Sequence, residues 1–438
     1  MKDIIAKGIF IFLDVTMIIL SVYLAFLLRD SIKTLEIHTI PYLTYLTFYP
    51  LYIILIAFFA YEGIYTYRYD FWQESRLVIK VILFSAVLVF AYLAMTKSIE
   101  DYSRLVIGFS FVLMAFFIPL AKNISKKFLY KIGLWQKKAK IYGDDSFLTA
   151  EIYGNPYLGY IRPKSKEELS TIFVNSKGND PETLKKILAS QIKKNHEVIF
   201  IPLMGDYDLT LSHIYELSNT RTNLIVYQNR LKSWYRKWIQ ELFNYCLVLI
   251  SLPILLPFIA LFALLIKKDS PGPIFFIHHR VGQNGKIIPM LKFRSMYTDA
   301  KQRLEQLCQE DSNIKEEWEK NFKLQNDPRV TKIGKFLRET SLDELPQIFN
   351  VLKGDMNFVG PRPVIKEEIE QYYKKDAQYY FMVKPGITGL WQVSGRSDTD
   401  YAFRVETDKW YVLNWSLWLD IVILFKTIKT VLKKEGAY

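Results

Sequence analysis

Two adjacent carboxylates, Asp343 and Glu344, are the residues of this chain that are best placed for chemistry. Basic residues precede them, and a proline-rich turn that carries a further arginine, residues 360–363, follows them. The preceding basic residues are Arg329, Lys332, Lys335 and Arg338. A carboxylate can attack phosphorus or hold a divalent cation, and nearby cations neutralise phosphate oxygens. This pattern therefore predicts a site that acts on phosphate groups.

The segment from Ser341 to Glu344 also matches a capping box, in which the serine caps a helix and the glutamate reaches back to the cap. The two interpretations are compatible, because a helix start stabilises ionised carboxylates and attracts phosphate groups. Neighbouring side chains on a helix point about 100° apart, so we expect the two acids to have different tasks. We predict that Asp343, in its ionised form, attacks phosphorus and that Glu344 binds Mg²⁺.

Six basic residues are predicted to bind the phosphates of a substrate, because arginine presents a planar fork that matches phosphate oxygens. Two of them follow a predicted strand over Lys286–Leu291, and prolines on both sides of Arg362 restrict its backbone. For any one of them, a solvated surface position is the usual alternative. The six residues are Lys292, Arg294, Arg329, Arg338, Arg362 and Arg396.

Three other residue types that often mark sites are less informative here. Trp391 could stack on a base or lie at a membrane interface, although packing is its usual role. The His278-His279 pair lacks a third ligand at metal spacing, so we expect no metal site there. The two cysteines, Cys246 and Cys308, lie in unlike surroundings, so neither a disulfide framework nor a zinc site is indicated.

The composition indicates membrane segments joined to soluble parts. The chain has 438 residues, half of them hydrophobic, yet its mean hydropathy is only +0.07. Its 57 basic and 44 acidic residues give a net charge of +13. This excess fits nucleic acid, anionic lipid or small anionic molecules as partners. The first apolar run is too long for a cleavable signal peptide and lacks a small-residue cleavage site.

Four apolar runs, residues 8–28, 41–61, 77–95 and 104–121, have the length of a membrane-spanning helix. Asp14 in the first run could be a polar partner inside the bundle, but we favour a position near the interface. Lysines cluster after the fourth run, which marks the cytoplasmic side and places the N-terminus there too. They are Lys122, Lys126, Lys127, Lys131, Lys137, Lys138 and Lys140. We predict a four-helix transmembrane bundle over residues 1–125.

Residues 138–230 are predicted to form a Rossmann-like α/β module, because apolar strands alternate with helices. We expect strands over Ala139–Gly143, Glu197–Pro202 and Thr222–Tyr227, and helices over Glu182–Lys194 and Tyr207–Asn219. A dinucleotide site requires a glycine-rich turn after the first strand. Here a single glycine, Gly143, precedes Asp144 and Asp145, which would repel a pyrophosphate. We therefore predict a structural or regulatory module without the dinucleotide fingerprint.

A fifth apolar run, residues 239–266, contains Pro253 and Pro257 at its centre. Each proline removes a backbone donor and kinks a helix, and Ser251 could donate its hydroxyl to a carbonyl freed at the break. Both flanks of the run are basic, whereas a full span carries its cations mainly on one side. We predict a re-entrant helix that enters one leaflet and returns, with an ordinary kinked span as the alternative.

The last part of the chain, residues 236–438, is predicted to be a catalytic domain of mixed α/β fold that ends in a helix over residues 415–434. Apolar side chains recur there at helical spacing, and lysines occupy another face. The pattern fits a helix at the membrane surface equally well as a helix packed on the protein core. The apolar residues are Trp418, Ile421, Phe425, Ile428 and Leu432.

From about Arg236 to its end, the chain resembles the bacterial sugar transferase family, the monotopic phosphoglycosyl transferases. The resemblance rests on the proline-broken apolar helix and on short motifs that are highly specific in combination. The motifs span residues 269–273, 280–282, 292–296, 327–331, 341–347, 354–356, 360–363 and 384–389. The four apolar runs and the α/β module are similar in architecture to the long form of this family. Asn357-Phe358 and Lys335 depart from the commoner residues but do not touch the two acids.

The resemblance implies transfer of a sugar 1-phosphate from a UDP-sugar to polyprenyl (undecaprenyl) phosphate, with release of UMP. It implies that Asp343 forms a covalent phosphosugar intermediate, that Glu344 binds Mg²⁺ and that Arg362 holds a phosphate. The product, a polyprenyl-diphosphosugar, starts polysaccharide, O-antigen or glycoconjugate assembly. The resemblance further implies the inner (cytoplasmic) membrane of a bacterium, a catalytic domain facing the cytoplasm, a possible homodimer and no nucleic acid partner.

Two other functions stay open at this point. A membrane-tethered nucleotide-sugar dehydratase would also combine four spans with an α/β domain, but it would need the glycine fingerprint that is missing after Gly143. An inactive scaffold in a polysaccharide complex would not need the acid pair that this chain retains.

Overall fold

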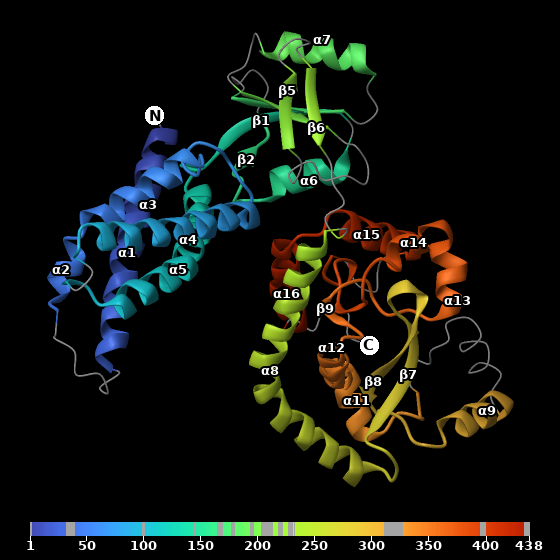
Figure 1. The fold of residues 1–438 in the computed structure, drawn as a ribbon. Coiled ribbons are helices and arrows are strands. Elements are labelled where there is room, and N and C mark those ends of the chain that lie inside the picture. Colours follow the sequence, from blue (N-terminus) through green and yellow to red (C-terminus); the bar gives the residue numbers. More distant parts are fainter. Residues whose placement is uncertain are drawn as a thin grey trace. The chain divides into compact units, whose positions relative to one another are not determined.

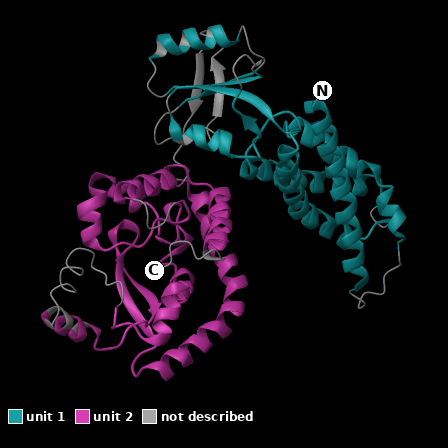
Figure 2. Cartoon of the chain, turned by 180° about the vertical axis from the view of Figure 1, so that it is seen from behind, with its two compact units in different colours: residues 1–203 teal, residues 204–438 magenta. Residues whose placement is uncertain are grey.

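The computed structural model of the chain divides into two compact units, Met1–Leu203 and Met204–Tyr438, which Figures 1 and 2 show. The structure describes residues 2–31, 40–98, 101–143, 145–163, 170–176, 180–192, 197–202, 213–217, 222–226, 231, 233–310, 327–394 and 400–432. Arg396, Asp144 and Lys232 lie outside these residues. Each unit has a hydrophobic core of its own.

The first unit begins with five helices. They are α1 (Lys2–Ser31), α2 (Tyr42–Leu46), α3 (Tyr49–Tyr61), α4 (Phe71–Met95) and α5 (Arg104–Lys131). The segments Lys2–Ser31, Tyr42–Tyr61, Phe71–Met95 and Arg104–Lys131 are each long and apolar enough to cross a membrane. This confirms that the four predicted apolar runs are helical, with a break between α2 and α3 in the second run. Ile18, Leu55, Val78 and Met114 join them in one core.

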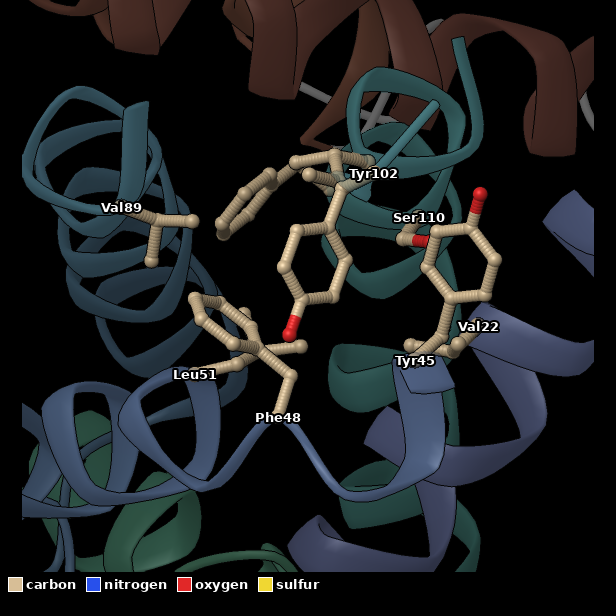
Figure 3. A pocket seen from close by; sticks show the side chains of 9 residues that line it. Val22, Tyr45, Phe48, Leu51, Val89, Tyr102 and Ser110 are labelled. Atoms are coloured by element: carbon tan, nitrogen blue, oxygen red, sulfur yellow. The ribbon is translucent and has the colours of Figure 1, made fainter. Parts of the chain in front are cut away.

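Aromatic side chains fill one end of this bundle, where they surround a small apolar pocket (Figure 3). The ring of Tyr102 lies 4.9 Å from that of Phe48 and 5.8 Å from that of Tyr45, centre to centre. The backbone N–H of Ser103 donates to the Tyr45 hydroxyl at 2.9 Å. The rings therefore fix the start of α5 against α2.

Asp14 is fully buried between the helices of the first unit, whereas the sequence favoured a position without a partner in the bundle. Its carboxylate accepts a hydrogen bond from the Tyr65 hydroxyl at 2.7 Å and lies 2.8 Å from the ammonium of Lys122. The prediction missed this because the partner cation lies more than a hundred residues away in the sequence. The alternative, a polar partner within the bundle, is what the structure shows.

Asp14 belongs to a buried ionic cluster with Glu74, Lys122 and Lys126, each at most 1 % exposed. Lys126 forms an ion pair and hydrogen bond with Glu74, and Lys122 lies 3.8 Å from the same carboxylate. The hydroxyl of Tyr157, a residue beyond the helical bundle in the sequence, donates to the Glu74 carboxylate at 2.8 Å. Two of the lysines that the sequence assigned to a cytoplasmic cluster are therefore paired inside the protein.

The rest of the first unit is an α/β arrangement with a parallel sheet of order β2-β1-β3-β4. Its elements are β1 (Lys137–Tyr142), α6 (Ser146–Gly154), β2 (Tyr160–Ile161), β3 (Thr171–Asn175), α7 (Pro181–Ile192) and β4 (Glu197–Ile201). The predicted strand–helix alternation is thus confirmed as far as β4. Gly143 has φ 110°, and a Cβ there would lie 2.8 Å from Asn175, so only glycine fits this turn. Asp145 caps α6 by accepting from the Leu148 N–H.

Strands β5 (His213–Leu217) and β6 (Thr222–Val226) pair antiparallel. The predicted helix over Tyr207–Asn219 is therefore wrong for residues 213–217, and residues 207–212 lie outside the described part of the chain. Ile214 and Tyr215 favour a strand, and the partner strand that follows a few residues later supplies the backbone hydrogen bonds.

Strands β5 and β6 already belong to the second unit, which continues with α8 (Trp234–Asp269). This single helix of 36 residues contains Pro253 and Pro257 and follows a bent course in Figure 1. It too is long and apolar enough to cross a membrane. Ser251 donates its hydroxyl to the Leu247 carbonyl at 2.6 Å. Pro253 has no N–H, so the carbonyl that it leaves without a donor is that of Leu249, half a turn further along the helix. The prediction that the Ser251 hydroxyl donates to the freed carbonyl is therefore wrong in detail.

A two-stranded hairpin, β7 (Phe275–Val281) and β8 (Ile287–Phe293), follows α8. Asn284 and Gly285 in its turn, η4 (Gln283–Gly285), both have positive φ. Next come α9 (Ala300–Glu310), α11 (Lys332–Glu339), the 3₁₀ turn η5 (Leu342–Gln347) and α12 (Ile348–Lys353). Ile288, Met290 and Phe293 of β8 join Leu337 and Ile348 in the core.

The remaining chain wraps around two short parallel strands, β9 (Asn357–Val359) and β10 (Gly386–Thr388). Between them lie α13 (Lys366–Glu368), the π-helical η6 (Ile369–Tyr373), η7 (Lys374–Asp376) and α14 (Ala377–Tyr380). After them come η8 (Trp391–Val393), α15 (Tyr401–Leu413) and α16 (Leu417–Leu432). In α16, Ile423 is buried in the core while Phe425 and Ile428 are exposed. The helix therefore packs on the protein and also presents an apolar face.

Candidate active site

Asp343 and Glu344 lie in η5, immediately after a sharp reversal of the chain at Ser341. Ser341 has φ 57°, a left-handed conformation, and its side chain makes no capping hydrogen bond. The predicted capping box is therefore wrong, because the reversal between α11 and η5 turns the serine away from the following N–H groups. A 3₁₀ turn has three residues per turn, so adjacent side chains project about 120° apart. Glu344 is thereby free to contact β8.

Lys292 of β8 holds both acids. Its ammonium lies 2.7 Å from Glu344 Oε1 and 3.4 Å from Asp343 Oδ2. Glu344 is the more exposed acid, with 32 % of its side chain accessible against 14 % for Asp343. The sequence predicted a basic residue at position 292 for substrate phosphates, and the structure adds that it bridges the two carboxylates.

The two carboxylates are shifted in opposite directions by their surroundings. Burial raises the pKa of Asp343 above its ordinary value, although Lys292 and Arg338 oppose the shift. Burial also acts to raise the pKa of Glu344, but the Lys292 ammonium and the more distant Arg362 outweigh it and hold that pKa below its ordinary value. Two neighbouring acids with divergent pKa values are suited to different tasks.

A small polar pocket opens beside Glu344. Arg362, which is exposed, lines it, and its guanidinium lies 5.8 Å from the centre of the Trp391 ring. Trp391 itself is 5 % exposed, so packing is its role here. The other residues that line the pocket are Arg280, Met290, Lys292, Gln347, Pro363, Ile387 and Gln392. A pocket with three cations and one flanking acid pair fits an anionic ligand.

The family model for bacterial sugar transferases matches residues 235–434, which contain this whole site. The chain is 35 % identical over 404 residues to the undecaprenyl-phosphate galactose phosphotransferase of Salmonella typhimurium. The alignment covers 85 % of this chain and 84 % of that protein. The chain belongs to the bacterial sugar transferase family. Because the alignment covers most of the chain, the similarity extends beyond the part that the motifs cover.

Two further relatives show different extents of similarity. The UDP-galactose-lipid carrier transferase of Erwinia amylovora is 36 % identical over 417 residues, covering 85 % of this chain and 84 % of that protein. The exopolysaccharide production protein ExoY of Sinorhizobium fredii is 45 % identical over 196 residues, covering 45 % of this chain and 86 % of that protein. A member of the family can therefore lack counterparts for more than half of this transferase.

Two arginines that the sequence proposed for substrate phosphates are used within the protein instead. Arg294 donates to the carbonyls of Pro271 and Ser270 at 2.6 and 2.7 Å, just beyond the end of α8. Arg329 forms a two-point pair with the carboxylate of Asp327 at 2.7 and 2.6 Å. The same planar fork that suits phosphate also suits carbonyl and carboxylate oxygens, so the sequence could not distinguish these roles.

The other four predicted cations have different positions. Arg338 donates to the Ser295 hydroxyl at 2.9 Å and is close enough to lower the pKa of Asp343, so the structure brings it to the acid pair. Lys292 and Arg362 line the pocket. Arg396 lies outside the described residues.

Three polar pocket residues of this transferase were not predicted as site residues: Arg280, Gln347 and Gln392. Gln347 follows Glu344 by three positions, and a 3₁₀ turn places such residues on one face. The spacing alone could therefore have indicated that Gln347 lies beside Glu344. Arg280 needed the β7–β8 pairing to reach the pocket, and no local pattern reveals that pairing. Within the part of the chain that the structure describes, the buried side-chain oxygen of Gln392 has no hydrogen-bond partner.

Proposed function

We propose that this transferase moves a sugar 1-phosphate from a UDP-sugar to polyprenyl phosphate, specifically undecaprenyl phosphate, and releases UMP. The undecaprenyl-phosphate galactose phosphotransferase is named for a lipid acceptor of this kind, which supports the proposed acceptor. The UDP-galactose-lipid carrier transferase is named for a UDP-sugar, which supports the proposed donor. The observation that carries the proposal is the contact of Lys292 with both acids at the edge of a cationic pocket. The product would start polysaccharide, O-antigen or glycoconjugate assembly.

The reaction proceeds in two displacements at the same phosphorus atom. In the first, a carboxylate oxygen of Asp343 attacks the phosphate that bears the sugar, and the bond from that phosphorus to the bridging oxygen breaks. UMP leaves with the electron pair. In the second, an oxygen of polyprenyl phosphate attacks the phosphosugar on Asp343, and the bond to the carboxylate breaks. The polyprenyl-diphosphosugar leaves, and the Asp343 carboxylate is restored.

The environment of Asp343 suits this role. Burial raises its pKa, which makes the ionised carboxylate a stronger nucleophile, and Lys292 favours the ionised form. Arg362 and Arg280 face the pocket where the leaving UMP and the transferred phosphate carry negative charge.

Glu344 is the proposed Mg²⁺ ligand. Mg²⁺ keeps several waters and binds through one or two carboxylates together with substrate phosphates. A carboxylate held ionised, with the amide side chains of Gln347 and Gln392 on the same pocket, fits this donor set. Phosphate oxygens of the substrate would complete the ligand set beside Glu344. When bound, Mg²⁺ neutralises phosphate charge.

Replacing Lys292 with methionine is expected to lower the transfer rate about 100-fold, because a charge that stabilises both acids and the developing phosphate charge is lost. Without its ammonium, the pKa of Asp343 rises further, and only the ionised form attacks. The acid limb of the pH–rate profile, where activity falls as pH decreases, therefore moves to higher pH. The profile of UMP formation measures this, and Lys353→Met, at an exposed lysine, is the matched control. An unmoved acid limb contradicts the role of Lys292.

The arrangement in the membrane is also a proposal. We infer that α8 enters one leaflet and returns, that the bundle spans residues 1–125, and that residues 138–230 and 236–438 form a Rossmann-like module and the catalytic domain. This places the catalytic domain on the cytoplasmic side of a bacterial inner membrane, where UDP-sugars are available. A homodimer fits the same arrangement.

The topology can be tested with single cysteines at Lys237 and Lys268, which flank the apolar part of α8, after replacement of Cys246 and Cys308. A membrane-impermeant thiol reagent is expected to label both positions from the cytoplasmic side. Labelling of the two positions from opposite sides would establish an ordinary span instead.

The proposed activity is tested with purified protein, polyprenyl phosphate, Mg²⁺ and a panel of UDP-sugars. We expect many turnovers of UMP release with at least one donor, and loss of these turnovers when the lipid or Mg²⁺ is omitted. Absence of UMP release with every donor contradicts the proposal.

A further inference from the structure

His278 lies on the same face of the β7–β8 hairpin as the pocket. In the antiparallel register, Phe276 pairs with Lys292, His278 with Met290, and Arg280 with Ile288. Directly paired residues project to the same side of a sheet. Lys292, Met290 and Arg280 all line the pocket, so the imidazole lies on the same face of the hairpin, next to residues that line the pocket. The Phe276 ring contacts the imidazole edge-on, 5.7 Å between centres.

The imidazole is uncharged at neutral pH. Burial is the main cause that lowers the pKa of His278 to about 4, and the cations Arg280 and Lys292 lower it further. Glu368 of α13 opposes the shift, and His279 adds to it. A neutral imidazole between two cations offers one N–H donor and one lone-pair acceptor.

This combination does not match a phosphate, which only accepts and for which the pocket already holds cations. It matches a hydroxyl group, which donates and accepts. Building on the proposed function, we propose that His278 is a specificity-determining residue that hydrogen-bonds a hydroxyl group of the nucleotide sugar beside its phosphates. The hydroxyl belongs to the transferred hexose or to the ribose, because a neutral imidazole binds a hydroxyl of either sugar in the same way.

The experiment compares a parent UDP-hexose that the wild-type transferase accepts with its monodeoxy analogues, including the 2′-deoxyribose form. A site that hydrogen-bonds a hydroxyl discriminates against the analogue that lacks it. We expect wild-type kcat/KM to fall roughly tenfold for one deoxy donor, the scale of one lost hydrogen bond. In His278→Phe, kcat/KM for the parent donor falls by the same factor, and the deoxy donor causes no additional loss. The position of that deoxygenation identifies the hexose or the ribose as the source.

The neighbouring histidine is the matched control. His279 pairs with Pro289 on the other face of the hairpin and is exposed, so His279→Phe is expected to keep the wild-type ratio between donors. His278→Gln, which retains a donor and an acceptor, is expected to restore part of the discrimination. If His278→Phe does not fold, His278→Ala provides the same comparison.

Equal losses of His278→Phe with every donor, or an unchanged ratio between parent and deoxy donors, would overturn the inference. Both outcomes require an active wild-type enzyme. Failure of the proposed function appears instead as a wild-type protein that releases no UMP from any donor, so the two failures are distinguishable.

Discussion

Asp343→Asn is expected to reduce the rate of sugar-phosphate transfer by at least about 1,000-fold, the scale on which removal of a nucleophile acts. Asparagine occupies the same space and preserves the packing of η5, but its amide neither carries charge nor displaces UMP from phosphorus. The variant is also expected to lose the covalent intermediate. Mass spectrometry of wild-type protein, stopped after mixing with UDP-sugar and no lipid, should show the phosphosugar on the peptide that contains Asp343.

A matched substitution separates a chemical from a general effect. Asp299→Asn changes an exposed aspartate that pairs with Arg303 in the next turn, and it is expected to keep wild-type turnover and the covalent adduct. Retained activity in Asp343→Asn, or an adduct located on another peptide, would rule out Asp343 as the nucleophile. Because the variant is isosteric, a near-native unfolding profile should accompany its loss of activity.

Glu74→Gln is expected to destabilise the first unit by about 3–5 kcal/mol, because removing one partner of a buried ion pair leaves an uncompensated charge. The cluster holds two acids, Asp14 and Glu74, against Lys122 and Lys126, and none of the four side chains is more than 1 % exposed. Glutamine preserves the volume and can still accept from Tyr157, so the loss reports charge alone. Denaturant-dependent amide exchange of α4 and α5 in micelles measures this free energy.

Two variants make the test specific. Adding Lys126→Met to Glu74→Gln removes the excess positive charge, so the double variant is expected to be more stable than Glu74→Gln alone. Glu62→Gln breaks a Glu–Lys pair with a 2.7 Å contact, but Lys80 in that pair is 65 % exposed. That control is expected to cost at most about 1 kcal/mol. A similar cost for both glutamates would show that burial adds nothing to the cluster.

Local sequence patterns predicted the long apolar helices and several of the strands. The apolar runs became α1, α3, α4 and α5 because a helix satisfies its own backbone hydrogen bonds within the segment. Strands β1 and β4 followed from short apolar runs between polar turns. The error over residues 213–217 arose because a five-residue strand depends on its partner, β6, and the sequence of the strand alone does not contain that pairing.

The sequence also predicted an acid pair and three cations that lie close together in the folded chain. Motif chemistry pointed to Asp343, Glu344, Lys292, Arg338 and Arg362, and the structure brings these residues to one region. It was local spacing that suggested them, because a turn with adjacent acids and a proline-flanked arginine is recognisable without a fold.

Only the tertiary structure decided how each charge is used. Arg294 and Arg329 look like Arg362 in the sequence, yet Arg294 donates to the carbonyls after α8 and Arg329 pairs with Asp327. Asp14 found its partner in Lys122, and Arg280 and His278 reached the pocket through the pairing of β7 with β8. The sequence determined which groups are available and which segments are helical, because these depend on nearby residues. Which charges meet, and which are left to bind a substrate, depends on contacts between distant segments, so only the folded chain could decide it.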